Sequence, residues 1–235
     1  LKNKLQNLSG PGIVLFGLTV SFAAIDWVMS LEPEWFSTIY GLLIMVGWGL
    51  TALAFAIVTT VILSKDERLE HVYQARHFHD HGKLLLAFVM LWAYFSFSQF
   101  LIIWSGNLPE EIPWYLRRTS GVWGYVALAV VALHFVLPFF LLLSRDFKRR
   151  RRSLALVAGL VLVMRLVDLF WIIAPSFHYE GFHNYPSSAN LLFFAAAIGM
   201  GGLWVFFFVW QLKKRPLIPL NDPQLQQTID HGRKH

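Results

Sequence analysis

Cysteine is absent from all 235 residues, and this absence excludes several kinds of redox site. Iron–sulfur clusters held by the protein, thiol catalysis and covalently attached c-type haem all depend on cysteine. Charged residues are also scarce, at 14% of the chain, whereas soluble proteins average about 25%. Because 56% of the residues are hydrophobic, the composition is typical of a membrane protein.

Six apolar stretches are long enough to cross the roughly 30 Å hydrocarbon core of a bilayer, which takes about 20 helical residues. They cover residues 12–31, 37–63, 84–104, 121–143, 153–173 and 191–212. No alternating strand pattern competes with them, and backbone groups in lipid must be hydrogen-bonded internally. The sequence therefore predicts an all-α membrane protein, with a bundle of six transmembrane helices in residues 1–212 and a polar tail in 213–235.

Lysine and arginine are distributed unequally between the two ends of these helices. The N-terminus, the second and fourth loops and the tail hold 17 of the 20. The positive-inside rule then places both ends of the chain in the cytoplasm. The basic run at 148–152 fits an anchor for anionic lipid headgroups better than a nucleic-acid site.

Four ionisable residues interrupt the apolar spans: Asp26, His134, Arg165 and Asp168. A charge at the centre of a membrane helix costs on the order of 3 kcal/mol, so such residues usually face the bundle interior or a water-filled cavity. Arg165 and Asp168 are three apart in "LVMRLVDLFW", so they share a helix face and are predicted to pair near mid-membrane. Two interpretations stay open: a structural ion pair that fixes helix packing, and a step in a proton path.

His134 is followed four residues later by Pro138, which cannot donate the helical hydrogen bond to the His134 carbonyl. We predict a kink there, where a free carbonyl and an imidazole could together hold a water molecule. A histidine bonded to a neighbouring helix beside an ordinary proline kink is the alternative. No second histidine lies well inside a span, so a haem held by two axial histidines is disfavoured.

Three histidines alternate in "RHFHDHGK", at positions 77, 79 and 81. They could supply zinc ligands, but a spacing of two fits an extended loop, and no second group of ligands is evident. A solvated cytoplasmic loop is favoured, with Asp80 near the cap of the third span. His81 is placed to collect protons from the cytoplasm.

Polar groups also interrupt the third span near its far end. Ser98 and Gln99 lie inside the span, and Trp104 belongs to an aromatic belt at the membrane surface. These three residues are the candidates for a polar pocket within the bundle.

Three blocks of sequence resemble a known family. They are "FAAIDWVMSLEPEWFSTIYG" at 22–41, "HDHGKLLLAFVMLWAYFSFSQFLIIWSGNLPEE" at 79–111 and "PLIPLNDPQL" at 216–225. Together they resemble the ActF-type membrane subunit of alternative complex III, a bacterial quinol:electron-acceptor oxidoreductase related to the polysulfide-reductase-type membrane anchors. Members of that family are larger, so the six spans are expected to be the C-terminal part of a subunit with roughly ten helices.

The resemblance implies a subunit of the bacterial inner membrane that binds no haem or cluster itself. Haem c and iron–sulfur clusters would belong to partner subunits on the outer side, and a paralogous membrane subunit would hold the main quinol site. This chain would scaffold those partners and contribute to proton translocation or quinone binding. Its neighbours would be lipid and other subunits, with no nucleic acid, metal or catalytic side chain of its own.

The matching blocks include Asp26 and Gln99, whereas His134, Arg165 and Asp168 lie outside them, so the roles of these three depend on the physical argument alone. The family pattern has an apolar residue where His81 stands. The candidates for a proton path are Asp26, His81, His134, Arg165 and Asp168. The candidates for quinone contact are Ser98, Gln99 and Trp104.

Two other functions remain as alternatives. One is a purely structural membrane anchor without transport. The other is an independent small-molecule transporter, which would predict internal inverted repeats and broken helices. Neither feature is evident in the sequence.

Overall fold

A computed structural model of the chain describes residues 2–66, 72–178, 189–214, 216–217 and 225. Helices dominate this part of the chain, and no strand occurs in it. Within these residues, six helices are long and apolar enough to cross a membrane: Asn3–Leu31, Tyr40–Leu63, Ala75–Gly106, Gly121–Leu143, Arg151–Phe177 and Leu191–Lys214. The predicted all-α fold with six membrane-spanning helices is confirmed. Most of the predicted polar tail lies outside the described residues.

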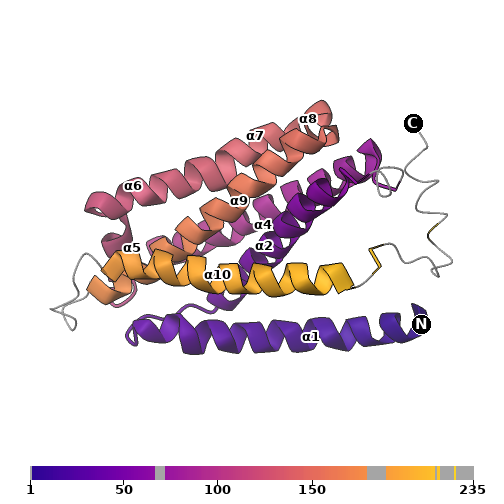
Figure 1. The fold of residues 1–235 in the computed structure, drawn as a ribbon. Helices are drawn as coiled ribbons and strands as arrows, with labels where there is room; N and C mark the ends of the chain where they lie inside the picture. Colours follow the sequence, from indigo (N-terminus) through magenta and orange to yellow (C-terminus); the bar gives the residue numbers. More distant parts are fainter. Residues whose placement is uncertain (1, 67–71, 179–188, 215, 218–224, 226–235) are drawn as a thin grey trace.

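Several of the short helical segments that join the spans lie at one end of the bundle (Figure 1). We call this end, which holds η1, α5 and η3, the α5 end; α8 and the start of α1 lie at the opposite end. In chain order the elements are α1 (Lys2–Trp27), η1 (Met29–Leu31), α2 (Tyr40–Leu63), α4 (Ala75–Gly106), α5 (Ile112–Thr119), α6 (Gly121–Ala129), η2 (Val130–Val136), α7 (Leu137–Leu143), α8 (Arg145–Arg149), α9 (Arg151–Ile173), η3 (Ala174–His178) and α10 (Ala189–Lys214).

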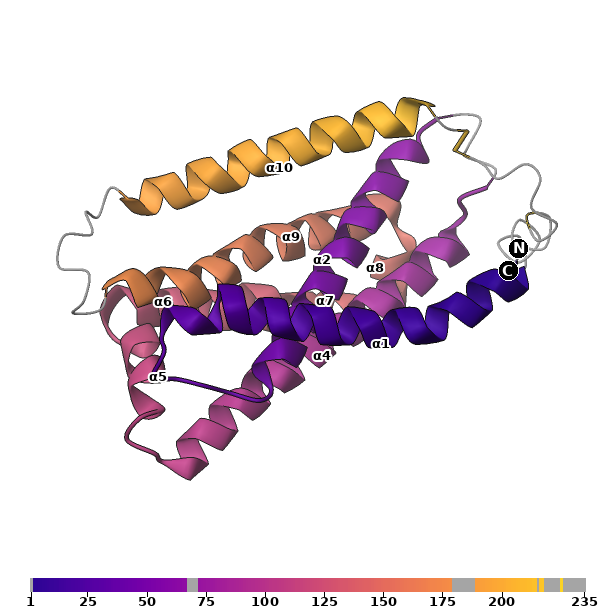
Figure 2. The ribbon, with the colours of Figure 1, turned by 90° about the horizontal axis from the view of Figure 1, so that it is seen from below.

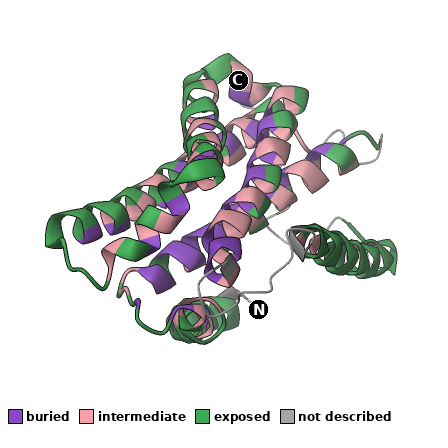
Figure 3. Cartoon of the chain, turned by 90° about the vertical axis from the view of Figure 1, so that its left-hand side faces the viewer, coloured by how far each residue is buried: buried purple, intermediate pink, exposed green. Residues whose placement is uncertain are grey.

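Helix α2 forms the centre of the bundle and packs against α1, α4 and α9. It is apolar on all faces, which is typical of a helix surrounded by others, and Leu50, Ala54 and Ile57 are almost fully buried. Buried residues gather on the facing sides of the central helices (Figure 3). Because α2 lies in the middle of the bundle, it packs against the predicted ion pair of Arg165 and Asp168 on α9.

Helix α10 runs along the outside of this bundle (Figures 1 and 2). None of its described side chains is buried. Its aromatic contacts include Phe55 of α2, whose ring lies 4.9 Å from Trp204 and 5.0 Å from Phe208. Most of the α10 surface is therefore open to lipid or to another subunit.

The third span begins earlier than predicted, because α4 extends from Ala75 to Gly106. Gln74 caps its first turn through a reciprocal pair of hydrogen bonds with His77, so "RHFHDHGK" is helical and not a loop. Asp80 is not at the cap; it pairs with Lys83, with 3.3 Å between Oδ1 and Nζ. Hydropathy detects only the apolar part of a helix whose charged end continues into water, and this accounts for the wrong boundary.

The histidines of this segment bond along the helix. His77 Nδ1 accepts from the backbone N–H of Gln74, and His81 Nδ1 lies 2.8 Å from the His77 carbonyl oxygen one turn away. In the described part of the chain, no group of three histidine, aspartate or glutamate residues gathers as a metal site.

The fourth span contains a π-helical segment, η2, over Val130–Val136, which includes His134. The N–H of Leu137 donates to the Ala132 carbonyl five residues back, immediately before Pro138. Since proline lacks an N–H, the α-helical bond to the His134 carbonyl is lost, and the chain adjusts by widening its turns. We expected a kink here, and the structure has a π-helical turn, a rare feature found mostly at functional sites.

Candidate functional site

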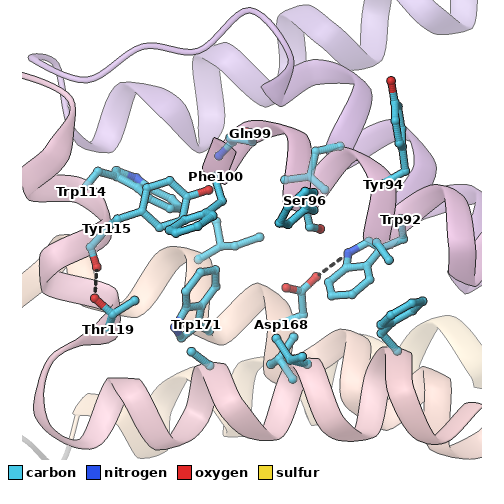
Figure 4. Close-up of a pocket in the computed structure, with 18 of the residues that line it drawn as sticks. Trp92, Tyr94, Ser96, Gln99, Phe100, Trp114, Tyr115, Thr119, Asp168 and Trp171 are labelled. Atoms are coloured by element: carbon cyan, nitrogen blue, oxygen red, sulfur yellow. Dashed lines mark hydrogen bonds between the residues drawn. The ribbon is translucent and has the colours of Figure 1, made fainter. Parts of the chain in front are cut away.

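Arg165 and Asp168 of α9 form a buried ion pair, as predicted from their spacing. Arg165 Nη1 donates to Asp168 Oδ2, and each residue is only 2% exposed. The same oxygen accepts from Trp92 Nε1 of α4 at 3.2 Å (Figure 4). The Trp92 ring meets the His134 ring edge to face, with 4.4 Å between centroids. We call these four residues the mid-span cluster; it joins α4, η2 and α9.

Gly47 of α2 makes room for the guanidinium of Arg165. A Cβ atom at position 47 would collide with the Nη2, Cζ and Nε atoms of that side chain. The pair is therefore enclosed from three sides by α2, α4 and η2.

We expect Gly47→Ala to destabilise the protein by about 1–3 kcal/mol, because the arginine is held by its partner and cannot move aside freely. Thermal unfolding of the purified protein in detergent measures this change. Gly159→Ala on α9 is the matched control, since a Cβ there meets no atom within 4 Å. The control is expected to be neutral or stabilising by about 0.5–1 kcal/mol. Equal effects of the two substitutions would contradict the predicted packing of Arg165 against Gly47.

Several buried polar atoms of the mid-span cluster have no hydrogen-bond partner among the described residues. They are Arg165 Nε and Nη2 and both ring nitrogens of His134. Buried polar groups in folded proteins are nearly always hydrogen-bonded, to protein or to ordered water. These donors and acceptors therefore favour water molecules, or a small polar ligand, beside the ion pair.

A cavity of about 570 Å³ adjoins the cluster, with walls from α4, α5, η2 and α9 (Figure 4). Aromatic and aliphatic side chains form nearly all of its lining, and we call it the aromatic cavity. Two buried polar groups reach it, the Asp168 carboxylate and the Gln99 amide, whose Oε1 has no partner among the described residues. Its volume is in the range of about 300–1,000 Å³ that small-molecule sites occupy.

The aromatic cavity opens sideways, between α4 and η2. Tyr94 and Phe97 of α4 and Val131 of η2 line it and are all more than half exposed. In a bilayer this surface faces lipid, so a hydrophobic molecule could enter from the membrane.

A second buried charge group closes the α5 end. Glu32, just after η1, accepts hydrogen bonds from Arg117, from Arg118 Nη2 at 2.7 Å and from Ser176 Oγ at 2.7 Å. Arg118 Nη2 also donates to the Ile172 carbonyl at 2.7 Å and to Ser176 Oγ at 2.8 Å. We call Glu32, Arg117, Arg118 and Ser176 the clamp; it joins η1, α5 and η3.

The clamp is continuous with the wall of the aromatic cavity. The guanidinium carbon of Arg118 lies 3.8 Å from the ring centroid of Trp114, and Trp171 Nε1 donates to the Arg118 carbonyl at 2.9 Å. Both tryptophans line the cavity. Burial lowers the pKa of Arg118, and the neighbouring Glu32 carboxylate, which favours the charged form, offsets only part of this effect.

The structure brings together three of the five candidates for a proton path, namely His134, Arg165 and Asp168. Asp26 is exposed on α1, and His81 lies near the start of α4, at the end of the bundle opposite the α5 end. Among the candidates for a polar pocket, Gln99 lines the aromatic cavity. Ser98 and Trp104 are not among its lining residues, and Trp104 is largely exposed.

The sequence did not identify the clamp or Trp92. Arg117 and Arg118 entered only the count of basic residues in the loops, and Glu32 carried no prediction, because all three lie between apolar spans. One signal was present: Arg117 and Arg118 are the two cations found in the loops at the α5 end, and they stand in a short aromatic helix. An arginine four residues after Trp114 can stack on that ring within one turn.

A comparison of the sequence with models of known protein families found no match, and a comparison with curated proteins found none either. Function is therefore inferred from the chemistry of the mid-span cluster, the aromatic cavity and the clamp.

Proposed function

We propose that the chain is an integral membrane subunit of a quinol-oxidising electron-transfer complex of the alternative complex III type. In this proposal it scaffolds partner subunits that carry the redox centres, and its mid-span cluster moves protons. The resemblance of three sequence blocks supports the type of complex. The observation that carries the proton role is the buried ion pair beside polar atoms that have no hydrogen-bond partner among the described residues.

Proton movement through a membrane requires groups that bind and release protons, linked by water. In the proposed role, Asp168 is the group that gains and loses the proton, and Arg165 stabilises its ionised form. Trp92 fixes the orientation of the carboxylate through its N–H group. His134, whose nitrogens are not engaged by the described residues, exchanges protons with Asp168 through intervening water.

A double substitution tests this role without leaving a charge buried alone. In Arg165→Gln/Asp168→Asn both side chains remain polar and able to pair, so the complex is expected to assemble and to oxidise quinol. The titratable carboxyl group is lost, and fewer protons should cross per electron. Reconstituted vesicles with a pH-sensitive dye measure this ratio beside the turnover rate.

The control is Asp146→Asn, at an exposed position of α8 outside the spans. It removes a carboxylate without touching the cluster, and its proton ratio should equal that of the unaltered complex. An assembled double variant with an unchanged ratio would leave the ion pair as a packing device and the chain as a structural anchor.

A second candidate role is the binding of a quinone head group in the aromatic cavity. The observation that favours it is the placement of two buried polar groups, Gln99 and Asp168, in an otherwise apolar cavity that opens toward lipid. Pockets of this kind, with few polar groups in apolar walls, are typical of ligand sites.

If a quinol binds there, Gln99→Leu should raise the KM for quinol by about tenfold, since a lost hydrogen bond in a buried site costs roughly 1–1.5 kcal/mol. Ser98→Ala, one residue away on α4 and outside the cavity lining, is the control. Steady-state quinol oxidation by the assembled complex gives both values. An unchanged KM in the Gln99 variant would exclude this cavity as the quinol site.

A further inference from the structure

We propose that Glu32 is a positioning residue which, through Arg118, closes the α5 end of the aromatic cavity to water. As far as the described residues show, access to the cavity is then through its lateral opening between α4 and η2. This inference concerns access to the cavity, so it stands or fails separately from the proton and quinone roles proposed above.

The first part of the evidence is the number of segments that the clamp holds together. Arg118 is 1% exposed and donates to Glu32, to Ser176 and to two backbone carbonyls, those of Trp114 and Ile172. These partners come from the loop after α1, from α5 and from the end of α9. A single guanidinium therefore seals the junction of three segments that are distant in sequence.

The second part is a stack of rings that depends on the same arginine. Trp114 contacts both the Arg118 guanidinium and the Trp35 ring, with 4.6 Å between the tryptophan centroids and 15° between their planes. Trp35 is 3% exposed and Trp114 is equally buried. This layer of two indoles and a guanidinium lies across the α5 end of the cavity, where Trp114 is part of the wall.

The third part is the relation of the clamp to Asp168. Asp168, Ile172 and Ser176 recur at four-residue intervals from α9 into η3, which at about 1.5 Å per residue puts Ser176 about 12 Å beyond Asp168. Ile172 lines the cavity and its carbonyl oxygen is held by Arg118. The clamp thus separates the mid-membrane carboxylate from the water at the α5 end.

Glu32 is the residue on which this arrangement depends. Its carboxylate is the acceptor that both arginines share, and it is itself only 8% exposed. Without its negative charge, Arg117 and Arg118 would repel each other, and the buried guanidinium would lose its counter-charge. Opening of the seal toward water is the expected response.

The absence of cysteine from this chain makes a direct test practical, because labelling of an introduced thiol can be read on this chain after the subunits are separated. Ser96→Cys places a nearly isosteric thiol on the cavity wall. The assembled complex that carries this variant is studied in right-side-out vesicles. A sulfonate-bearing methanethiosulfonate, which cannot cross the bilayer, is added on the α5 side, predicted to be the outer side. We expect slow labelling with the clamp intact, and labelling faster by about tenfold or more when Glu32→Gln is added.

Three companion variants keep the result interpretable. Glu34→Gln, an exposed glutamate two residues away, should leave the labelling rate unchanged, and Glu32→Asp should largely restore protection. Ser176→Ala removes one hydroxyl and should give an intermediate rate, which serves as the test if Glu32→Gln does not assemble.

A neutral, lipid-soluble maleimide should label the thiol equally in all variants, through the lateral opening. Equal labelling by the charged reagent with the clamp intact and altered, or no labelling by the maleimide, would overturn the proposal.

Discussion

Asp168→Ala is expected to destabilise the protein by about 3–5 kcal/mol. The substitution leaves the Arg165 guanidinium buried without a counter-charge, and arginine cannot become neutral by giving up its proton. It also removes the acceptor of the Trp92 N–H group. Thermal unfolding of the protein extracted in mild detergent, together with its yield in membranes, measures the loss.

The reverse substitution is expected to cost less. In Arg165→Met the remaining carboxyl group can be neutralised by binding a proton, so no charge need stay buried alone. The double variant Arg165→Met/Asp168→Leu should recover most of the stability lost in Asp168→Ala, because an apolar pair can replace a buried ion pair at little cost. If the double variant is as unstable as Asp168→Ala, the loss comes from altered packing, and the explanation by an uncompensated charge is wrong.

Arg118→Met is expected to have an effect of similar size, about 3–5 kcal/mol. Four acceptors lose a hydrogen bond from Arg118 at once: the Ser176 hydroxyl, the carbonyls of Trp114 and Ile172, and the Glu32 carboxylate, which keeps only Arg117 and Ser176 as donors among the described residues. Each buried acceptor left unsatisfied costs about 1–3 kcal/mol, partly recovered where water can enter. The decrease in melting temperature of the detergent-extracted protein tests this.

Arg117→Met provides the comparison, because the two arginines are adjacent and share Glu32. The Arg117 side chain is 28% exposed, and its loss leaves Glu32 paired with Arg118. Partly exposed ion pairs contribute about 0–1 kcal/mol, so a small change is expected. Equal losses from the two substitutions would contradict the central position assigned to Arg118.

The sequence predicted most of the fold because each span is a local pattern. Hydropathy identified all six membrane helices, and a spacing of three residues predicted the pairing of Arg165 with Asp168. Pro138 indicated that the fourth span is irregular, although the π-helical form was not foreseen. The start of α4 was wrong because a helix can extend beyond the membrane, where polar residues no longer distinguish it from a loop.

The partners of the buried charges could not be predicted in this way. Trp92 reaches Asp168 from 76 residues away, and Gly47 makes room for Arg165 from another helix. Such contacts depend on the register of packed helices, which composition and periodicity do not specify. Glu32 and Arg118 illustrate the same limit, since in sequence each is an ordinary charge between two spans.

The clamp also has a consequence for the biogenesis of the protein. Glu32 precedes Arg118 by 86 residues and Ser176 by 144, so a growing chain exposes this glutamate long before its partners are synthesised. Membrane helices insert in order from the N-terminus, and the clamp becomes complete only when the fifth span has been inserted. Until then, Glu32 and Arg118 can pair with each other but lack the hydrogen bonds that Ser176 and the Ile172 carbonyl supply. A chain arrested before residue 176 would therefore lack the Ser176 partner of Glu32 and Arg118 at the α5 end, and a quality-control protease could recognise the incomplete clamp there.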